Sequence, residues 1–133
     1  RRHERLLVEG DDLRALARRL PLALVTGRPR PDAERFLAEN ALSDCFRVVV
    51  TMEDGPVKPD PAPVRLALDR LGVHHAWMIG DTPDDIRAAR AAAVLPIGIT
   101  APGDDPETAR MTLADAGAAR ILTTINELME ILP

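Results

Sequence analysis

The chain has 133 residues, 46% of them hydrophobic and 29% charged, which fits one globular domain and excludes a disordered chain. The net charge of −4, without a basic stripe interleaved with aromatics, argues against a nucleic-acid partner. Cys45 is the only cysteine, which excludes an intramolecular disulfide and a cysteine-rich metal site. No signal peptide and no apolar run of membrane-spanning length is visible, so we expect a cytoplasmic protein without a membrane partner.

The first half of the chain alternates helices with short apolar runs. Asp11 and Asp12 can cap a first helix. Residues 22–26 and 46–51 are aliphatic and short, which predicts two buried strands. A helix predicted from about residue 31 to residue 40 separates them.

The second half continues the alternation. Its predicted elements are a helix over 61–71, a strand over 76–80, a helix from 82, a strand over 94–99, a helix over 105–117, a short strand at 121–122 and a capped helix from 124. Pro96 has no N–H to donate, which favours an edge position for the strand over 94–99. Strands separated by helices predict an α/β fold, with a Rossmann-like parallel sheet between two layers of helices.

Two polar groups follow strands or precede helices in positions suited to phosphate binding. Thr26 and Gly27 come directly after a strand and offer a hydroxyl and backbone N–H groups, although an ordinary turn has the same composition. Lys58 stands in a proline-flanked turn before a helix, where its ammonium could neutralise a phosphoryl group. An exposed loop lysine is the alternative.

The segment Gly80-Asp81-Thr82-Pro83-Asp84-Asp85 places carboxylates where a strand ends and a helix begins. Oxygen ligands at this edge of a sheet suit Mg²⁺, which binds through one or two carboxylates and a phosphate. Thr82 and Asp85 also form a plain capping-box pattern, so capping remains an alternative role for Asp85. Capping explains Asp81 less well, because Thr82 already supplies the cap.

Taken together, Thr26-Gly27, Lys58-Pro59 and the 80–85 segment resemble the second, third and fourth motifs of the haloacid dehalogenase superfamily of phosphohydrolases. The resemblance runs from about residue 7 to residue 132 and looks closest to phosphoglycolate-phosphatase-like members. It implies a phosphatase of a small phosphorylated metabolite that uses an aspartyl-phosphate intermediate. It also implies that Thr26, Gly27 and Lys58 bind phosphate, that Thr26 and Lys58 act in catalysis, and that Asp81 and Asp85 bind Mg²⁺.

The family's first motif, a strand that ends in Asp-x-Asp and carries the nucleophile, does not precede Thr26. Asp11 and Asp12 follow Glu9-Gly10 rather than an apolar strand, so they do not fit this role. The resemblance implies that the absent strand belongs between the strands over 22–26 and 76–80. The chain begins with charged residues and no methionine, so we expect an upstream segment with the nucleophile and a cap. Residues 1–10 would then be the tail of a helical cap and residues 11–133 an incomplete core domain, inactive alone.

Several alternatives stay open. A domain with the family's scaffold but no nucleophile would serve interaction or regulation instead of catalysis. A response-regulator receiver domain would place its acidic cluster before the Thr and Lys, and a dinucleotide-binding domain would need G-x-G-x-x-G, which is absent. The substrate, the oligomeric state and the role of Arg28 as a substrate contact are not fixed by these motifs. We expect the remaining polar candidates to be structural, with exposed histidines at 74 and 75, no ligand partners for His3 and a packing role for Cys45.

Overall fold

The predicted alternation of strands and helices is present in the computed structural model, which describes residues 10–101 and 103–132. The expectation that residues 1–10 are the tail of a cap falls, apart from Gly10, outside these described residues. The elements are α1 (Gly10–Arg19), β1 (Ala23–Val25), α2 (Arg30–Glu39), η1 (Ser43–Cys45), β2 (Val48–Val50), η2 (Met52–Asp54), α3 (Ala62–Leu71), β3 (Trp77–Gly80), α4 (Pro83–Ala91), β4 (Leu95–Ile99), α5 (Pro106–Ala116), β5 (Arg120–Leu122) and α6 (Ile125–Ile131).

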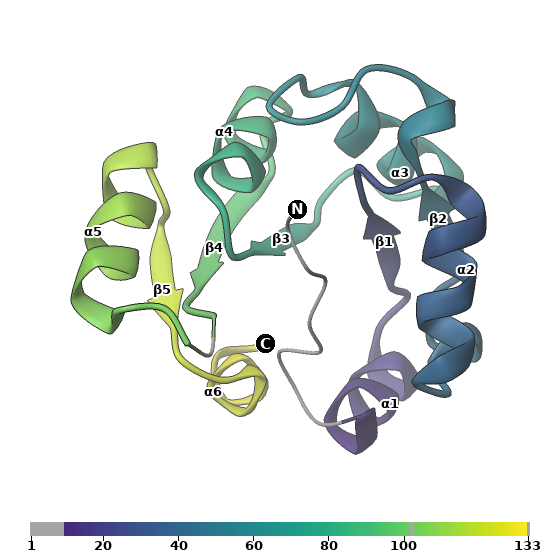
Figure 1. The fold of residues 1–133 in the computed structure, drawn as a ribbon, viewed down its shortest axis with the longest axis horizontal. Helices are drawn as coiled ribbons and strands as arrows, with labels where there is room; N and C mark the ends of the chain where they lie inside the picture. The colour runs from purple at the N-terminus through teal and green to yellow at the C-terminus, as the bar shows by residue number, and fades with distance from the viewer. Residues whose placement is uncertain (1–9, 102, 133) are drawn as a thin grey trace.

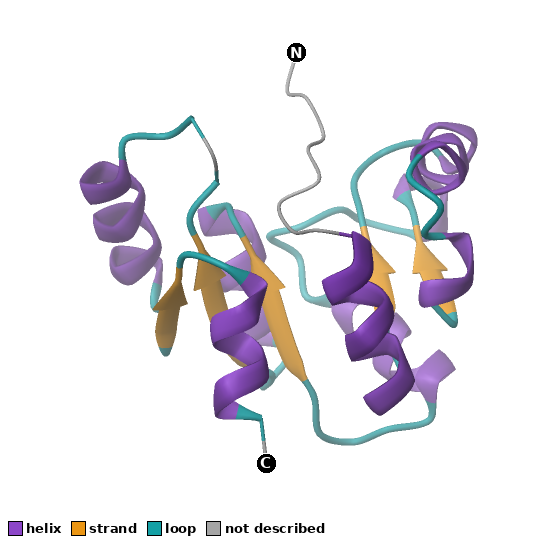
Figure 2. Ribbon diagram, turned by 90° about the horizontal axis from the view of Figure 1, so that it is seen from below, coloured by secondary structure: helices purple, strands orange, loops and turns teal. Residues whose placement is uncertain are grey.

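The strands form two parallel sheets. β1 pairs with β2, with Leu24 opposite Val49, and β3, β4 and β5 form the second sheet in that order. All five arrows point the same way in Figure 2, so the carboxyl ends of both sheets lie at one edge of the molecule. The fold class predicted from the sequence is therefore confirmed, and within residues 10–101 and 103–132 no strand pairs β1 with β3.

The prediction that Pro96 marks an edge strand is wrong. β4 lies between β3 and β5, where four of its five residues are buried. Pro96 is tolerated because it is the second residue of the strand, and the ladder with β5 begins only at Ile97. Its carbonyl still accepts a hydrogen bond from the Ala119 N–H, at 2.8 Å.

Local signals end α3 and begin α6 where the sequence predicts, whereas the prediction that Asp11 and Asp12 cap the first helix is wrong, because α1 begins at Gly10 and includes both residues. Gly72 closes α3 in the left-handed conformation, with φ +73°, and its N–H reaches the last carbonyls of the helix. Thr124 and Glu127 form the capping box that opens α6.

Helices cover both faces of the strands (Figures 1 and 2). α3 packs on β1 and β2, and α4 packs on β3 and β4, which makes one layer. α1 and α6 contact each other on the opposite face (Figure 2). Both layers therefore join the two sheets, although no strand does so in the described residues.

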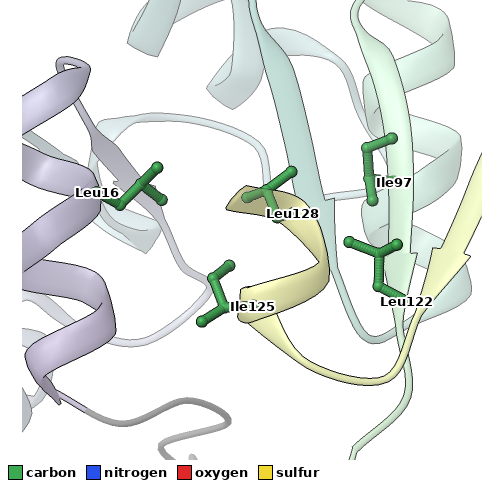
Figure 3. Close-up of a cluster of buried hydrophobic side chains, with 5 residues drawn as sticks. All are labelled: Leu16, Ile97, Leu122, Ile125 and Leu128. Atoms are coloured by element: carbon green, nitrogen blue, oxygen red, sulfur yellow. The ribbon is translucent and has the colours of Figure 1, made fainter. Parts of the chain in front are cut away.

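One cluster of buried hydrophobic side chains connects the two sheets. Leu16 of α1 belongs to the same buried cluster as Ile125 and Leu128 of α6 and Ile97 and Leu122 of the second sheet (Figure 3). These side chains are 1–5% exposed. Burial of a Leu or Ile side chain contributes about 1.5–3 kcal/mol, so this cluster is a main source of cohesion between the sheets.

A cavity of about 1460 Å³ lies between β1 and β3. Every residue of both strands lines it, together with apolar side chains of α1, α3 and α6. β1 and β3 are accordingly half-buried or exposed except at Gly80, whereas β4 is largely buried. The expected space between strands 22–26 and 76–80 is confirmed. We call it the interstrand cavity.

No helix within residues 10–101 and 103–132 combines the length and apolar character needed to cross a membrane.

Candidate functional site

The carboxyl end of the interstrand cavity gathers the residues that the motifs predict. Thr26, Gly27, Lys58, Asp81 and Asp85 all line it. Gly27 follows β1, Lys58 lies in the loop before α3, and the two aspartates flank the start of α4. Parallel pairing produces this convergence, because each strand delivers its following loop to the same edge.

Thr26 closes β1 through its backbone. Its N–H donates to the Val50 carbonyl at 2.9 Å, which extends the β1–β2 pairing by one residue. Its side-chain Oγ1 accepts from the Arg28 N–H at 3.2 Å, so the hydroxyl oxygen is held in the turn beyond the strand. Gly27 is exposed there, and a Cβ on it would meet no atom within 4 Å.

Lys58 spans the carboxyl end of the cavity. Its Nζ donates to the Val25 carbonyl of β1 at 3.0 Å and pairs with Asp85 Oδ1 of α4 at 2.5 Å. The Lys58 and Asp85 side chains are 17% and 10% exposed, so solvent screens the pair only weakly. Lys58 therefore ties the first sheet to the first turn of α4, beside the second sheet.

A hydrogen-bonded network anchors the loop that leads to Lys58. Arg30 Nη2 donates to Asp54 Oδ2 at 3.0 Å and to the Val49 carbonyl at 2.8 Å, which joins α2 to η2 and β2. The buried Thr51 donates its N–H to Asp54 Oδ2 at 2.8 Å and its hydroxyl to Glu53 Oε1 at 2.9 Å. The start of this loop is thereby fixed on the first sheet.

These hydrogen bonds lower the pKa values of both carboxyl groups. The Thr51 N–H is the main cause of the lowered Asp54 pKa, assisted by the Thr51 hydroxyl and Arg30. For Glu53 the Thr51 hydroxyl is the main cause of the lowered pKa, assisted by the Arg30 N–H.

This network should make stability depend on acid pH. A carboxyl whose folded pKa lies below its unfolded value stabilises the fold above the unfolded pKa, and the contribution is lost as the pH falls through the folded pKa. We expect the free energy of unfolding to fall as the pH drops from about 5 towards 3, and to fall less steeply in Asp54→Asn. Urea unfolding across this range, followed by the fluorescence of Trp77, measures it. Equal slopes for the parent and Asp54→Asn would contradict the assignment.

Asp85 is the most buried of the acidic candidates, at 7% exposure. Its Oδ2 accepts from the N–H groups of Asp81 and Thr82, each at 3.2 Å, and its own N–H donates to Thr82 Oγ1 at 3.2 Å. The capping box is therefore present, and it is combined with the Lys58 ion pair on the other oxygen. A negative charge here also suits the N-terminal end of the α4 dipole.

Gly80 allows this close packing. A Cβ at position 80 would lie 2.2 Å from the Asp85 Cβ and 2.6 Å from Oδ2. Any side chain would therefore displace Asp85, and with it the partner of Lys58. The close approach of the Asp85 side chain to the end of β3 therefore requires glycine at position 80.

The Lys58–Asp85 pair should contribute measurably to stability. Double-mutant cycles with Lys58→Met and Asp85→Asn should give a coupling of about 1–3 kcal/mol, because the charges are mostly buried. The matched control is Arg87 with Asp84 on α4, 3.3 Å apart and more than half exposed, where we expect about 0.2–0.5 kcal/mol. Urea unfolding monitored through Trp77 provides both values. Equal couplings would show that burial does not strengthen the Lys58–Asp85 pair.

Asp81 is half-buried just after the carboxyl end of β3, and its backbone N–H donates a hydrogen bond to Asp85 Oδ2. Among the residues that the structure describes, no group of three His, Cys, Asp or Glu side chains could hold a metal by itself. Mg²⁺ needs only one or two protein carboxylates when a phosphate and water complete its shell. The donor set of Asp81 and Asp85 fits that requirement.

Two contacts were not predicted from the sequence. The Lys58–Asp85 pair joins residues 27 positions apart (85 − 58), and nothing local indicates it. The Arg28 guanidinium lies over the Phe36 ring, 5.8 Å from its centroid, an arrangement that the eight-residue separation (36 − 28) alone does not imply. The expectations for His74, His75 and Cys45 hold: the histidines are exposed, and Cys45 is buried beside Leu37 and Leu42.

Comparison with protein families gives a match over residues 11–99 to the haloacid dehalogenase-like hydrolases. The match includes β1 to β4 and all of the site residues above.

Two curated relatives and one solved structure illustrate the similarity. The chain is 41% identical over 98% of its length to an imidazoleglycerol-phosphate dehydratase of Phytophthora nicotianae, and covers 32% of that protein. It is 42% identical over 61% of its length to a phosphoglycolate phosphatase of Yersinia pestis, and covers 36% of that protein. A crystal structure of a putative β-phosphoglucomutase from Thermotoga maritima superposes with a TM-score of 0.80 at 28% identity, over 93% of this chain and 59% of that one. The chain thus spans about a third of the length of these curated relatives.

Proposed function

Since the chain belongs to the haloacid dehalogenase-like hydrolase family, we propose that the complete protein is a Mg²⁺-dependent phosphatase of small phosphorylated metabolites. The observation that carries this proposal is the convergence of Thr26, Lys58 and Asp81 at one end of the interstrand cavity. A hydroxyl, an ammonium and a carboxylate are the groups that position and neutralise a phosphoryl group.

In this proposal the phosphate lies beyond the end of β1. The Thr26 hydroxyl and the Gly27 N–H donate to its oxygens, and the exposed glycine leaves room for close approach. Lys58 neutralises charge on the phosphoryl group and on the nucleophile. Its ammonium is already held at the site by Val25 and Asp85, so little reorganisation is needed.

Asp81 would hold Mg²⁺, with Asp85 bound to it directly or through water. When bound, the cation supplies positive charge that stabilises the negative charge of the transferring phosphoryl group. Asp85 also keeps Lys58 and the Asp81 backbone in position through the contacts that the structure shows. Because both oxygens of Asp85 already have these partners, contact with Mg²⁺ through a water molecule fits Asp85 better than direct contact.

The nucleophile is proposed to lie outside these 133 residues. The resemblance assigns it to an aspartate that attacks phosphorus, releases the alcohol and forms an aspartyl-phosphate, which water then hydrolyses. In this arrangement residues 1–10 are the tail of a helical cap, and residues 11–133 are the core domain without its central strand. We place the complete protein in the cytoplasm, with no nucleic-acid or membrane partner.

The relatives suggest two substrate classes. One is a phosphorylated two-carbon acid, as named for the Yersinia pestis relative. The other is an imidazole-bearing phosphomonoester, since the Phytophthora nicotianae relative carries the similar segment within a protein named for such a compound. Arg28, which follows the phosphate-binding turn, is the candidate contact for a substrate carboxylate.

A substrate panel tests the proposal. The complete protein should release phosphate from p-nitrophenyl phosphate, 2-phosphoglycolate or imidazoleglycerol phosphate when Mg²⁺ is present, and should stop when EDTA removes the cation. Phosphate release that is unaffected by EDTA would contradict the metal assignment. No release from any phosphomonoester would favour the second candidate.

That second candidate is a non-catalytic interaction or regulatory domain. It is favoured by one observation, that Lys58 and two N–H groups already contact the Asp85 carboxylate. The residues upstream of Arg1 discriminate the candidates, because an apolar strand ending in Asp-x-Asp is required only by the enzyme.

A further inference from the structure

Two separate segments supply the proposed phosphate contacts, and they are paired beyond the strands that precede them. One segment, residues 26–30, holds the hydroxyl and N–H donors, and the other, residues 51–58, follows β2 and ends at Lys58. We call the second segment the lysine loop. The Met52 N–H donates to the Arg28 carbonyl at 3.1 Å, which continues the parallel pairing of β1 and β2. The two segments therefore lie side by side where they leave the sheet.

Arg30, at the start of α2, joins the same two segments through its backbone and its side chain. Its N–H donates to Glu53 Oε1 at 3.0 Å, and its Nη2 donates to Asp54 Oδ2 at 3.0 Å and to the Val49 carbonyl at 2.8 Å. The other oxygen of Asp54 lies 3.8 Å from Arg70 Nη1 of α3. We call Arg30, Glu53 and Asp54 the clasp. It connects α2, the lysine loop and α3.

The local sequence gives no reason for an arginine at this position. Arg30 is the first residue of α2, where a positive side chain opposes the helix dipole. Its partner within the helix, Glu34, lies 3.7 Å away and is 64% exposed, so that pair contributes little. The Asp54 side chain is only 18% exposed, so solvent screens the pair between the segments less. Contact with the lysine loop therefore accounts for Arg30 better than helix formation does.

The clasp lies close to Lys58 along the chain. After Asp54 the chain passes Gly55, whose φ of +142° favours glycine, and it reaches Lys58 three residues later. With the clasp broken, the lysine loop would lose its side-chain ties to α2 and β2. The ammonium of Lys58 would then carry more of the attachment of the loop, through Val25 and Asp85. A displacement of about 1 Å at a reacting centre can lower a rate about 100-fold.

We infer that the clasp is a positioning device that holds Lys58 at a fixed distance from the Thr26–Gly27 turn, and that Arg30 is its central positioning residue. Arg30 acts through the lysine loop and does not touch the substrate. The inference rests on the proposed function for the phosphoryl group, whereas the coupling of the two segments follows from the clasp contacts alone. The clasp should matter most in the transition state, when both segments must contact the phosphoryl group at once.

Two oxyanion inhibitors of the complete protein test this inference. Orthovanadate adopts the five-coordinate geometry of the transferring phosphoryl group and needs both segments at the correct separation, whereas tetrahedral inorganic phosphate tolerates a looser fit. In Mg²⁺-dependent hydrolysis of p-nitrophenyl phosphate, Arg30→Met and Asp54→Asn should each raise the Ki of vanadate about tenfold or more and change the Ki of phosphate by less than about threefold. A smaller folded fraction changes neither Ki, so this readout separates positioning from stability.

A double variant and a matched control complete the test. Arg30→Met combined with Asp54→Asn should raise the Ki of vanadate by no more than about threefold beyond the larger single effect, because both substitutions remove the same contact. The control is Arg35→Met, since Arg35 pairs with Asp32 within α2, at 3.5 Å and exposed, and both Ki values should stay unchanged. If Arg30→Met weakened vanadate and phosphate equally, or if Arg35→Met had the same effect, the inference would be overturned.

Amide hydrogen exchange of the complete protein separates this inference from the proposed function. Arg30→Met should accelerate exchange about tenfold or more in residues 26–30 and in residues 51–58 together, and Arg35→Met should not. If the complete protein hydrolyses no phosphomonoester, the proposed function fails, and a joint acceleration still supports the coupling of the two segments. If exchange rises in one segment or in neither, the inference is wrong, even if the complete protein is an active phosphatase.

Discussion

Residues 1–133 by themselves should show no Mg²⁺-dependent hydrolysis of p-nitrophenyl phosphate, whereas the protein extended upstream of Arg1 should hydrolyse it. The chain offers Thr26, Lys58 and Asp81 at the site, but no apolar strand ending in Asp-x-Asp precedes Thr26. Without a nucleophile, the proposed aspartyl-phosphate intermediate cannot form. The rate of hydrolysis by residues 1–133 should therefore lie below the detection limit, whereas hydrolysis by the extended protein should be measurable.

The same extension should raise stability. Each buried backbone group left without a partner costs about 1–3 kcal/mol, and the facing edges of β1 and β3 carry several. A domain is stable by only about 5–15 kcal/mol, so residues 1–133 should unfold at much lower urea concentration than the extended protein. Cooperative melting of the isolated residues, with ester hydrolysis that is lost in Asp81→Ala, would show that both the strand and the nucleophile arguments are wrong.

Asp81→Asn in the complete protein should lower kcat/KM for p-nitrophenyl phosphate by about 100- to 1000-fold. The substitution keeps the shape and the backbone N–H that Asp85 accepts, and removes the negative charge proposed to hold Mg²⁺. The Mg²⁺ concentration needed for half-maximal activity should rise in the same variant.

Asp84→Asn is the matched control. Asp84 lies in the first turn of α4, more than half exposed, and pairs with Arg87 outside the proposed machinery. Its activity should stay within about threefold of the parent, because exposed ion pairs contribute little. Trp77 fluorescence should confirm that both variants fold. If Asp81→Asn behaved like Asp84→Asn, Asp81 would have to be removed from the metal site.

The sequence by itself determined the elements and their order. Short aliphatic runs, glycine at the end of α3 and the Thr124–Glu127 capping box are local signals, and each acts within a few residues. The positions of Thr26, Lys58 and Asp81 at strand ends and helix starts follow from the same local signals. The family motifs could be recognised for this reason, and residues 11–99 match the family.

Only the tertiary structure decided how these elements pair. Pro96 suggested an edge strand, yet β4 is central, because the position of a proline within a strand matters as much as its presence. The Lys58 contacts with Val25 and Asp85 join segments 33 and 27 positions apart. Such contacts depend on which strands lie side by side, and that is set by burial of whole helix faces such as Leu16 against Leu128. Local sequence patterns carry no information on this packing, so the division into two sheets around one cavity became visible only in three dimensions.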